Sequence, residues 1–127
     1  MFSLRHLPPL VVATGMGLGG TMPFFSPSRA MTTFGLPSSL ADNPAAQVLM
    51  TIMAGRNIAL GAAIWLLYLQ GKLGSVDTVL GCVGFVGLVD GWVCWREGLI
   101  GTAWFRAANG LFFGGWGVLG MTAGRGR

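Results

Sequence analysis

The sequence predicts an all-α protein, a four-helix transmembrane bundle that forms one domain over residues 1–127. The strongest observation is the scarcity of charge. Charged residues make up 9% of the chain and hydrophobic residues 53%, whereas about a quarter of a soluble domain is charged. The mean hydropathy of +0.66 points the same way. The 22 glycines follow no collagen period, and in so apolar a chain they indicate close helix–helix packing within a bilayer.

The first predicted helix spans about residues 7–25. Gly15 and Gly19 have the GxxxG spacing that lets a second helix approach closely. Arg5 and His6 precede the apolar run, as they would in a signal peptide, but no small-residue cleavage site follows it. We therefore expect a membrane-spanning helix, with a cleaved signal as the alternative. His6 is expected to be a flanking residue rather than a ligand.

Residues 26–43 are predicted to form a long loop, because Pro27, Pro37 and several Ser and Thr residues interrupt the apolar pattern. Residues 33–37 within it are too apolar for a freely solvated linker. We expect that segment to lie on the bilayer surface or to fold back on the helices.

The second helix is expected at about residues 45–70. Asp42 and Asn43 are candidates for its N-cap, and Pro44 follows at a first helical position. At about 1.5 Å per residue this helix would be about 39 Å long, more than the roughly 30 Å of a bilayer's hydrocarbon core. It is therefore long enough to cross the membrane.

The third and fourth helices are expected at about residues 76–97 and 99–121. Ser75 can cap the third helix, and Asp77 in its first turn suits the helix dipole. Both helices carry glycines at helical spacing, so each has a smooth face. These glycines are Gly81, Gly84, Gly87 and Gly91 on the third helix, and Gly110 and Gly114 on the fourth.

Four spans would place both termini on one side of the membrane. Basic residues then favour a cytoplasmic location for the termini, because that side carries Arg5, Lys72, Arg125 and Arg127 against Arg29 and Arg96 on the other. The net charge of +4 is spread along the chain without a basic stripe. The expected partner is therefore the lipid bilayer and not nucleic acid. The glycine faces could also join the chain to copies of itself or to another protein.

Charged residues inside the apolar runs form a predicted polar layer. Arg56 and Asp90 each lie seventeen positions from Leu73 in the second turn, so antiparallel helices would place them at one depth. Asp90 and Arg106 each lie eight positions from Gly98 in the third turn. Because an unpaired charge at this depth costs several kcal/mol, we expect Arg56 and Asp90 to form an ion pair.

This layer supplies the candidate site. As catalytic candidates, Arg56 and Arg106 would polarise a carbonyl or enolate, and Asp90 would orient Arg56 or move a proton. Three further polar residues in or near the layer are ligand-binding candidates: Asn57, Asn109 and Glu97. The alternatives are a structural clamp between Arg56 and Asp90, and an Arg106 that extends to the interface. The sequence has no His cluster, CxxC motif or paired carboxylates, so neither a metal site nor a cofactor is predicted.

Four sequence features resemble those of a known family: residues 34–37 (FGLP), residues 55–61 (GRNIALG), Asp90-Gly91, and a fourth helix rich in small residues. The chain resembles a family of small four-helix integral membrane proteins known only as a domain of unknown function and distantly similar to DoxX-like proteins. Members of that family often carry Asp after the motif arginine and His near the start of the fourth helix. Asn57 and residues 104–106 occupy those places here.

The resemblance implies a function in secondary metabolism, because fungal members are often encoded in natural-product gene clusters. We therefore expect a multi-pass membrane protein that acts in the biosynthesis of a lipophilic metabolite, as a small enzyme or an accessory factor. The expected ligand is a lipophilic small molecule. The alternatives are a non-enzymatic membrane scaffold or partner subunit, and a small transporter.

Overall fold

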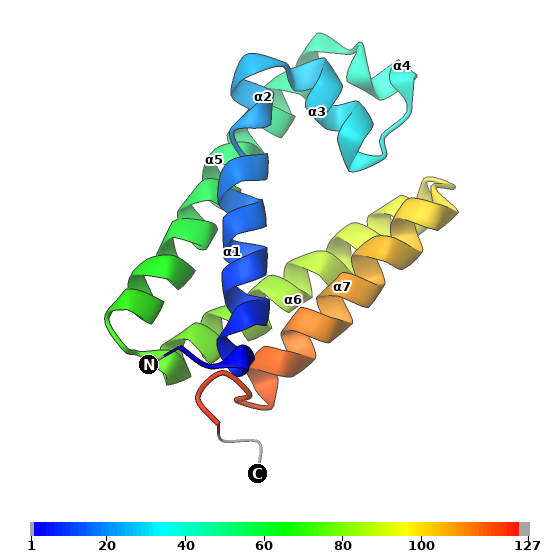
Figure 1. The fold of residues 1–127 in the computed structure, drawn as a ribbon. Coiled ribbons are helices and arrows are strands. Elements are labelled where there is room, and N and C mark those ends of the chain that lie inside the picture. The colour runs from blue at the N-terminus through cyan, green and yellow to red at the C-terminus, as the bar shows by residue number, and fades with distance from the viewer. Residues whose placement is uncertain (1, 125–127) are drawn as a thin grey trace.

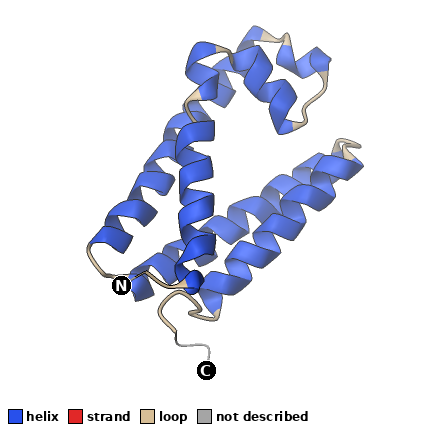
Figure 2. Ribbon diagram, in the orientation of Figure 1, coloured by secondary structure: helices blue, strands red, loops and turns tan. Residues whose placement is uncertain are grey.

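The computed structural model describes residues 2–124, and all regular structure within them is helical (Figure 2). A short 3-10 helix, η1 (Leu4–His6), precedes seven α-helices (Figure 1). They are α1 (Leu7–Gly19), α2 (Met22–Phe25), α3 (Pro27–Phe34), α4 (Ser38–Ala41), α5 (Pro44–Leu69), α6 (Leu73–Arg96) and α7 (Ile100–Val118). The all-α class is therefore confirmed. Among the described residues, α5 and α6 are the two helices that are long and apolar enough to cross a membrane.

The predicted first helix is divided into α1 and α2. The proline ring of Pro23 would clash with the carbonyl group of Gly19 four residues earlier in a continuous helix, and α1 ends at Gly19. The side-chain hydroxyl of Thr21 donates to the carbonyl oxygen of Leu18 at 2.6 Å. Gly20 lies at the break, where a β-carbon would be 2.7 Å from the side chain of Ile58 on α5. The chain can turn here because glycine keeps this approach open.

The prediction of a loop over residues 26–43 is wrong, because this segment contains α3 and α4. Pro27 occupies the first turn of α3, where a proline starts a helix rather than breaking it. Gly35 ends α3 with a φ of 104°. Of the two arrangements expected for residues 33–37, the structure has the fold-back, since Gly35 lies against Thr102 and Phe34 against Arg106 of α7.

The longer helices lie near their predicted positions. Asn43 caps α5, and its side-chain oxygen accepts from the backbone N–H groups of Ala45 at 2.9 Å and Ala46 at 3.4 Å. Helix α6 begins at Leu73, so the prediction that Ser75 caps it is wrong. Helix α7 ends at Val118, before the predicted residue 121.

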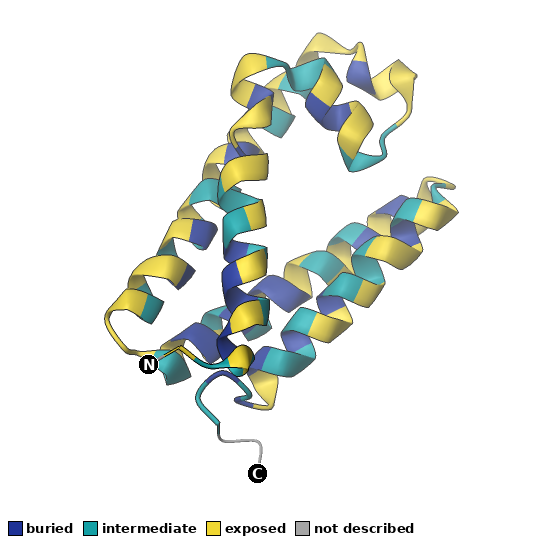
Figure 3. Ribbon diagram, in the orientation of Figure 1, coloured by how far each residue is buried: buried dark blue, intermediate teal, exposed yellow. Residues whose placement is uncertain are grey.

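The long helices form two antiparallel pairs, α1 with α5 and α6 with α7, and each pair is called a hairpin here although α2, α3 and α4 lie between α1 and α5 in the chain. The two hairpins meet at one end of the molecule and diverge toward the other (Figure 1). The end where they meet is called the base here. It contains the turn between α5 and α6 and both ends of the described chain (Figure 1). The buried residues Ala13, Ile64, Val76 and Val83 form one core cluster that joins α1, α5 and α6, and Figure 3 shows that the buried segments of these helices gather toward the base. Arg125 and Arg127, used in the predicted topology, lie outside the described residues.

Glycine contacts explain why α6 packs against α7. A β-carbon at Gly84 would overlap the backbone of Gly114, and one at Gly87 would lie 2.8 Å from the Cα of Gly110. The predicted smooth faces of these two helices are therefore in contact. The GxxxG pair of the first helix behaves differently: nothing lies within 4 Å of a β-carbon at Gly15 or Gly19.

Candidate functional site

Helices α6 and α7 bring three polar side chains together, Asp90, Cys94 and Arg106, called here the Arg106 cluster. The helix backbones approach closely beside it, since a β-carbon at Gly91 would lie 3.0 Å from the carbonyl oxygen of Ala103. Asp90 and Arg106 are half-buried, and a β-carbon at Gly87, one turn before Asp90, would lie 3.2 Å from the carbonyl oxygen of Arg106. Cys94 is 4% exposed. The prediction that Asp90 and Arg106 share one depth is in agreement with this arrangement.

The guanidinium group of Arg106 contacts both the ring and the carbonyl group of Phe34 at the end of α3. The Cζ atom of Arg106 lies 3.7 Å from the ring centroid of Phe34, within the range of a cation–π interaction. Its Nη2 atom donates to the carbonyl oxygen of Phe34 at 3.4 Å, a long hydrogen bond. The Nε atom is buried and has no hydrogen-bond partner among the described residues. Arg106 therefore keeps unused donor groups in a half-buried site.

The predicted ion pair between Arg56 and Asp90 is not formed. Arg56 is exposed, and the only ion pair within 4.0 Å in residues 2–124 joins Arg96 to Glu97 at 3.8 Å. The prediction assumed that α5 and α6 run side by side, but these helices diverge from their shared turn (Figure 1). Helix α6 packs on α7 instead, because its glycines face that helix.

The three ligand-binding candidates do not gather around Arg106. Glu97 is exposed at the end of α6, beside Arg96. The side-chain amide of Asn109 donates to the carbonyl oxygen of Phe105 on its own helix at 2.8 Å. Asn57 is half-buried on α5, in the other hairpin. Their ligand-binding roles stay predictions.

A second polar cluster lies at the base, and sequence reasoning missed it. The carboxylate of Asp77 is 3% exposed and accepts from the backbone N–H groups of Thr122 at 3.0 Å and Ala123 at 2.8 Å. The carboxylate of Asp77 therefore binds the backbone of the C-terminal segment. The prediction that Asp77 lies in the first turn of its helix and interacts with the helix dipole is wrong, because α6 begins at Leu73. A carboxylate early in an apolar run was the only available signal, and the sequence gives no spacing that connects residue 77 to residue 122.

His6 belongs to the same end of the molecule, where it directly precedes α1 as expected of a flanking residue but is also buried and hydrogen-bonded. It is 6% exposed, and its Nδ1 atom lies 3.2 Å from the backbone nitrogen of Ser3 and 3.0 Å from the hydroxyl of Tyr68. A backbone N–H can only donate, so Nδ1 acts as an acceptor and the ring is neutral with its proton on Nε2. Burial lowers the pKa of His6, the positive charge of Arg5 adds to this, and Asp77 acts in the opposite direction.

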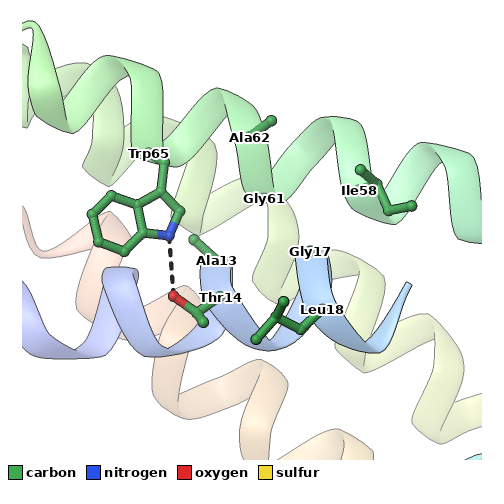
Figure 4. Close-up of a pocket in the computed structure, with 8 residues that line it drawn as sticks. All are labelled: Ala13, Thr14, Gly17, Leu18, Ile58, Gly61, Ala62 and Trp65. Carbon is green, nitrogen blue, oxygen red and sulfur yellow. Dashed lines mark hydrogen bonds between the residues drawn. The ribbon is translucent and has the colours of Figure 1, made fainter. Parts of the chain in front are cut away.

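An apolar groove of about 380 Å³ lies between α1 and α5 (Figure 4). At its edge the indole N–H of Trp65 donates to the side-chain hydroxyl of Thr14 at 3.0 Å. The groove is lined by Ala13, Thr14, Gly17 and Leu18 of α1 and by Ile58, Gly61, Ala62 and Trp65 of α5. Within residues 2–124, no group of three or more His, Cys, Asp or Glu side chains is arranged to hold a metal ion.

Residues 13–120 match the model of a protein family described as Domain of unknown function (DUF4267). The chain belongs to the DUF4267 family. This confirms the resemblance to a family known as a domain of unknown function, whereas the likeness to DoxX-like proteins and the link to fungal gene clusters stay predictions. No curated protein and no solved structure matches the chain at a significant level. The Arg106 cluster and the groove lie wholly within the DUF4267 match, whereas His6 and Thr122 of the base lie outside it.

Proposed function

We propose that the protein is a multi-pass membrane protein whose Arg106 cluster binds the carbonyl or anionic group of a lipophilic small molecule. It acts in the biosynthesis of a lipophilic secondary metabolite, as a small enzyme or an accessory factor. The observation that carries the proposal is the guanidinium of Arg106, which has a buried Nε without a partner and one long hydrogen bond.

The membrane placement extends from α5 and α6 to the other two long segments. Helix α7 has 19 residues, about 28 Å, close to the roughly 30 Å hydrocarbon core. It presents Trp104, Phe105 and Leu111 at exposures of 64% or more. Helices α1 and α2 together form the fourth span. Lipid is the solvent that suits such surfaces, and the termini lie on the cytoplasmic side.

The chemistry follows from the unsatisfied donors. A purely structural arginine at this depth would have its N–H groups paired, because unpaired buried polar groups are costly. Arg106 has five N–H donors, and its neighbour Asp90 forms no ion pair within 4.0 Å among the described residues. A ligand carbonyl or carboxylate would accept from Arg106, and Asp90 would orient the ligand or move a proton. Arg56 has no part in this arrangement because it lies on the other hairpin.

Metabolite profiling with matched variants tests this function. Cells that lack the gene would be complemented with the wild-type chain, Arg106→Met or Arg56→Met, at equal membrane abundance. We expect one lipophilic compound to disappear with the deletion, to return with wild type and Arg56→Met, and to stay absent with Arg106→Met. The same compound should be present in lipid extracts of purified wild-type protein. An unchanged profile in the deletion strain would contradict the proposal.

One observation favours a second function, a scaffold or partner subunit. The GxxxG face of α1 is unoccupied, since Gly15 and Gly19 are exposed and have open space around them. A helix of another chain could pack on this face. Crosslinking in native membranes separates the two functions, because a scaffold would lose its partner in Gly15→Leu and keep it in Arg106→Met.

A further inference from the structure

We propose that the groove between α1 and α5 binds one acyl chain of a bilayer phospholipid. This site uses no residue of the Arg106 cluster and goes beyond the function proposed above, with which it shares only the membrane placement. The structure supports it through the groove's shape, its polarity and its depth along α5.

Small residues give the groove its shape. At Gly61 a β-carbon would lie 2.5 Å from the carbonyl oxygen of Ala13 and 3.1 Å from the backbone nitrogen of Gly17, so the two helices touch there. The space beside Gly17 is open, since nothing lies within 4 Å of a β-carbon placed at this residue. The larger side chains of Leu18 and Ile58 stand beside this floor, as Figure 4 shows. The result is a shallow groove, open along one side, with exposed Leu18, Ala62 and Trp65 on its rim.

The polarity of the groove favours a hydrocarbon chain over a polar ligand. Its two polar side chains, Thr14 and Trp65, bind each other at 3.0 Å (Figure 4). The remaining lining residues are glycine, alanine, leucine and isoleucine, which have no side-chain hydrogen-bonding groups. An acyl chain forms no hydrogen bonds and therefore leaves none unmade on entry, whereas a polar head group would find only the hydroxyl of Thr14 as a side-chain donor with no acceptor among the described residues.

The depth of the groove fits one leaflet. It runs along α5 from Trp65 to Ile58, about 10 Å at about 1.5 Å per residue. Trp65 lies about 6 Å from the end of α5 at Leu69. Both ends of the groove are thus in the C-terminal half of a helix of about 39 Å that crosses a core of roughly 30 Å. A chain that enters beside Trp65 would remain in the leaflet nearest the base.

A leucine at position 17 provides the test, because nothing lies within 4 Å of a β-carbon there and the rest of the side chain would extend into the groove. Gly15→Leu is the matched control, since it makes the same change on the same helix at another open position. The full chain would be reconstituted in vesicles of phosphatidylcholine that carries a diazirine in the middle of one acyl chain. After irradiation and digestion, mass spectrometry would locate the labelled residues.

We expect labelling of wild type to concentrate on Leu18, Ile58 and Ala62. Gly17→Leu should lower it about tenfold at these residues, since the side chain displaces the buried acyl segment, and Gly15→Leu should leave it unchanged. Labelling of Phe85, exposed on α6, should be equal in all three proteins and serves as the reference for bulk lipid.

Three results would overturn the proposal: groove labelling no higher than at Phe85, groove labelling unaffected by Gly17→Leu, or a dimer that Gly17→Leu dissociates with no loss of lipid label. The last result would assign the groove to a second copy of the chain. Each is distinguishable from failure at the Arg106 cluster, because Gly17→Leu leaves Arg106, Asp90 and Phe34 intact.

Discussion

The Cζ atom of Arg106 on α7 lies 3.7 Å from the ring centroid of Phe34 at the end of α3. This contact joins the two diverging hairpins away from the base, because α3 packs on α5 while Arg106 belongs to the other hairpin. The nearby approach of Gly35 to Thr102 strengthens the same junction. The segment expected to be a loop therefore holds the arginine of the candidate site in place.

Replacing Phe34 with leucine should weaken this junction. The cation–π interaction is worth about 1–2 kcal/mol in a partly desolvated site, so the protein should unfold at a lower temperature in detergent micelles. Phe34→Tyr keeps an aromatic ring and should stay near wild type. Phe25→Leu is the control, because Phe25 is 87% exposed. Equal melting temperatures for Phe34→Leu and wild type would contradict a role for this contact.

Gly84→Leu should separate α6 from α7. A β-carbon at Gly84 overlaps the backbone of Gly114, and overpacking of a well-packed contact costs about 1–3 kcal/mol or more. We expect a lower melting temperature and loss of any activity that depends on Asp90 and Arg106 being close. Gly115→Leu on α7 has nothing within 4 Å of its β-carbon and should be tolerated. A crosslink between cysteines placed at the ends of the two helices would report their separation directly.

The pairing of α6 with α7 could be predicted because two independent patterns agree. Glycines at helical spacing occur on both helices, and the short turn at Gly98 forces antiparallel neighbours, which places Asp90 beside Arg106. Helices α5 and α6 also share a short turn, but Gly61 of α5 packs on α1. No matched glycine face holds α5 against α6, so these helices diverge. Arg56 is therefore exposed and forms no ion pair with Asp90.

The base could not be predicted from periodicity. His6 contacts Tyr68, and Asp77 contacts Thr122 and Ala123, through the packing of chain ends that follow no helical repeat. The position of Arg106 on Phe34 is of the same kind, since it depends on how α3 folds back after Pro27. Repeats show which helix faces meet, whereas such contacts depend on the path of the connecting segments.

Asp77→Asn should destabilise the base. The carboxylate accepts two backbone N–H groups in a buried site, whereas an amide would bring its own N–H₂ donor against one of them. Loss of a hydrogen bond to a charged group costs about 1.5–3 kcal/mol, so unfolding in detergent should occur at a lower denaturant concentration. Asp42→Asn is the matched control, since Asp42 is exposed. Proteolysis near residue 122 should also become faster in Asp77→Asn alone.

Acid should weaken the base through His6. Because the folded-state pKa of His6 is lowered by burial and by Arg5, its contribution to stability is complete above the unfolded pKa of about 6.5. That contribution is lost as the pH falls through the folded pKa, since the unfolded chain then binds more protons. Protonation would place an N–H on Nδ1 against the N–H of Ser3, which can only donate, and the hydroxyl of Tyr68 would have to turn to accept from Nδ1.

Melting temperatures measured from pH 8 down to about pH 4.5, on both sides of the ordinary histidine pKa of about 6.5, check this dependence. Wild type should lose stability with a slope of at most about 1.4 kcal/mol per pH unit, the limit for one proton. His6→Gln should be less stable than wild type at pH 8. Its stability should not show the additional decrease that begins in wild type as the pH falls below about 6.5. Tyr68→Phe should lower stability at pH 8 by about 1 kcal/mol and keep a slope, because the N–H of Ser3 still opposes protonation. An unchanged slope in His6→Gln would contradict the assignment of the acid sensitivity to His6.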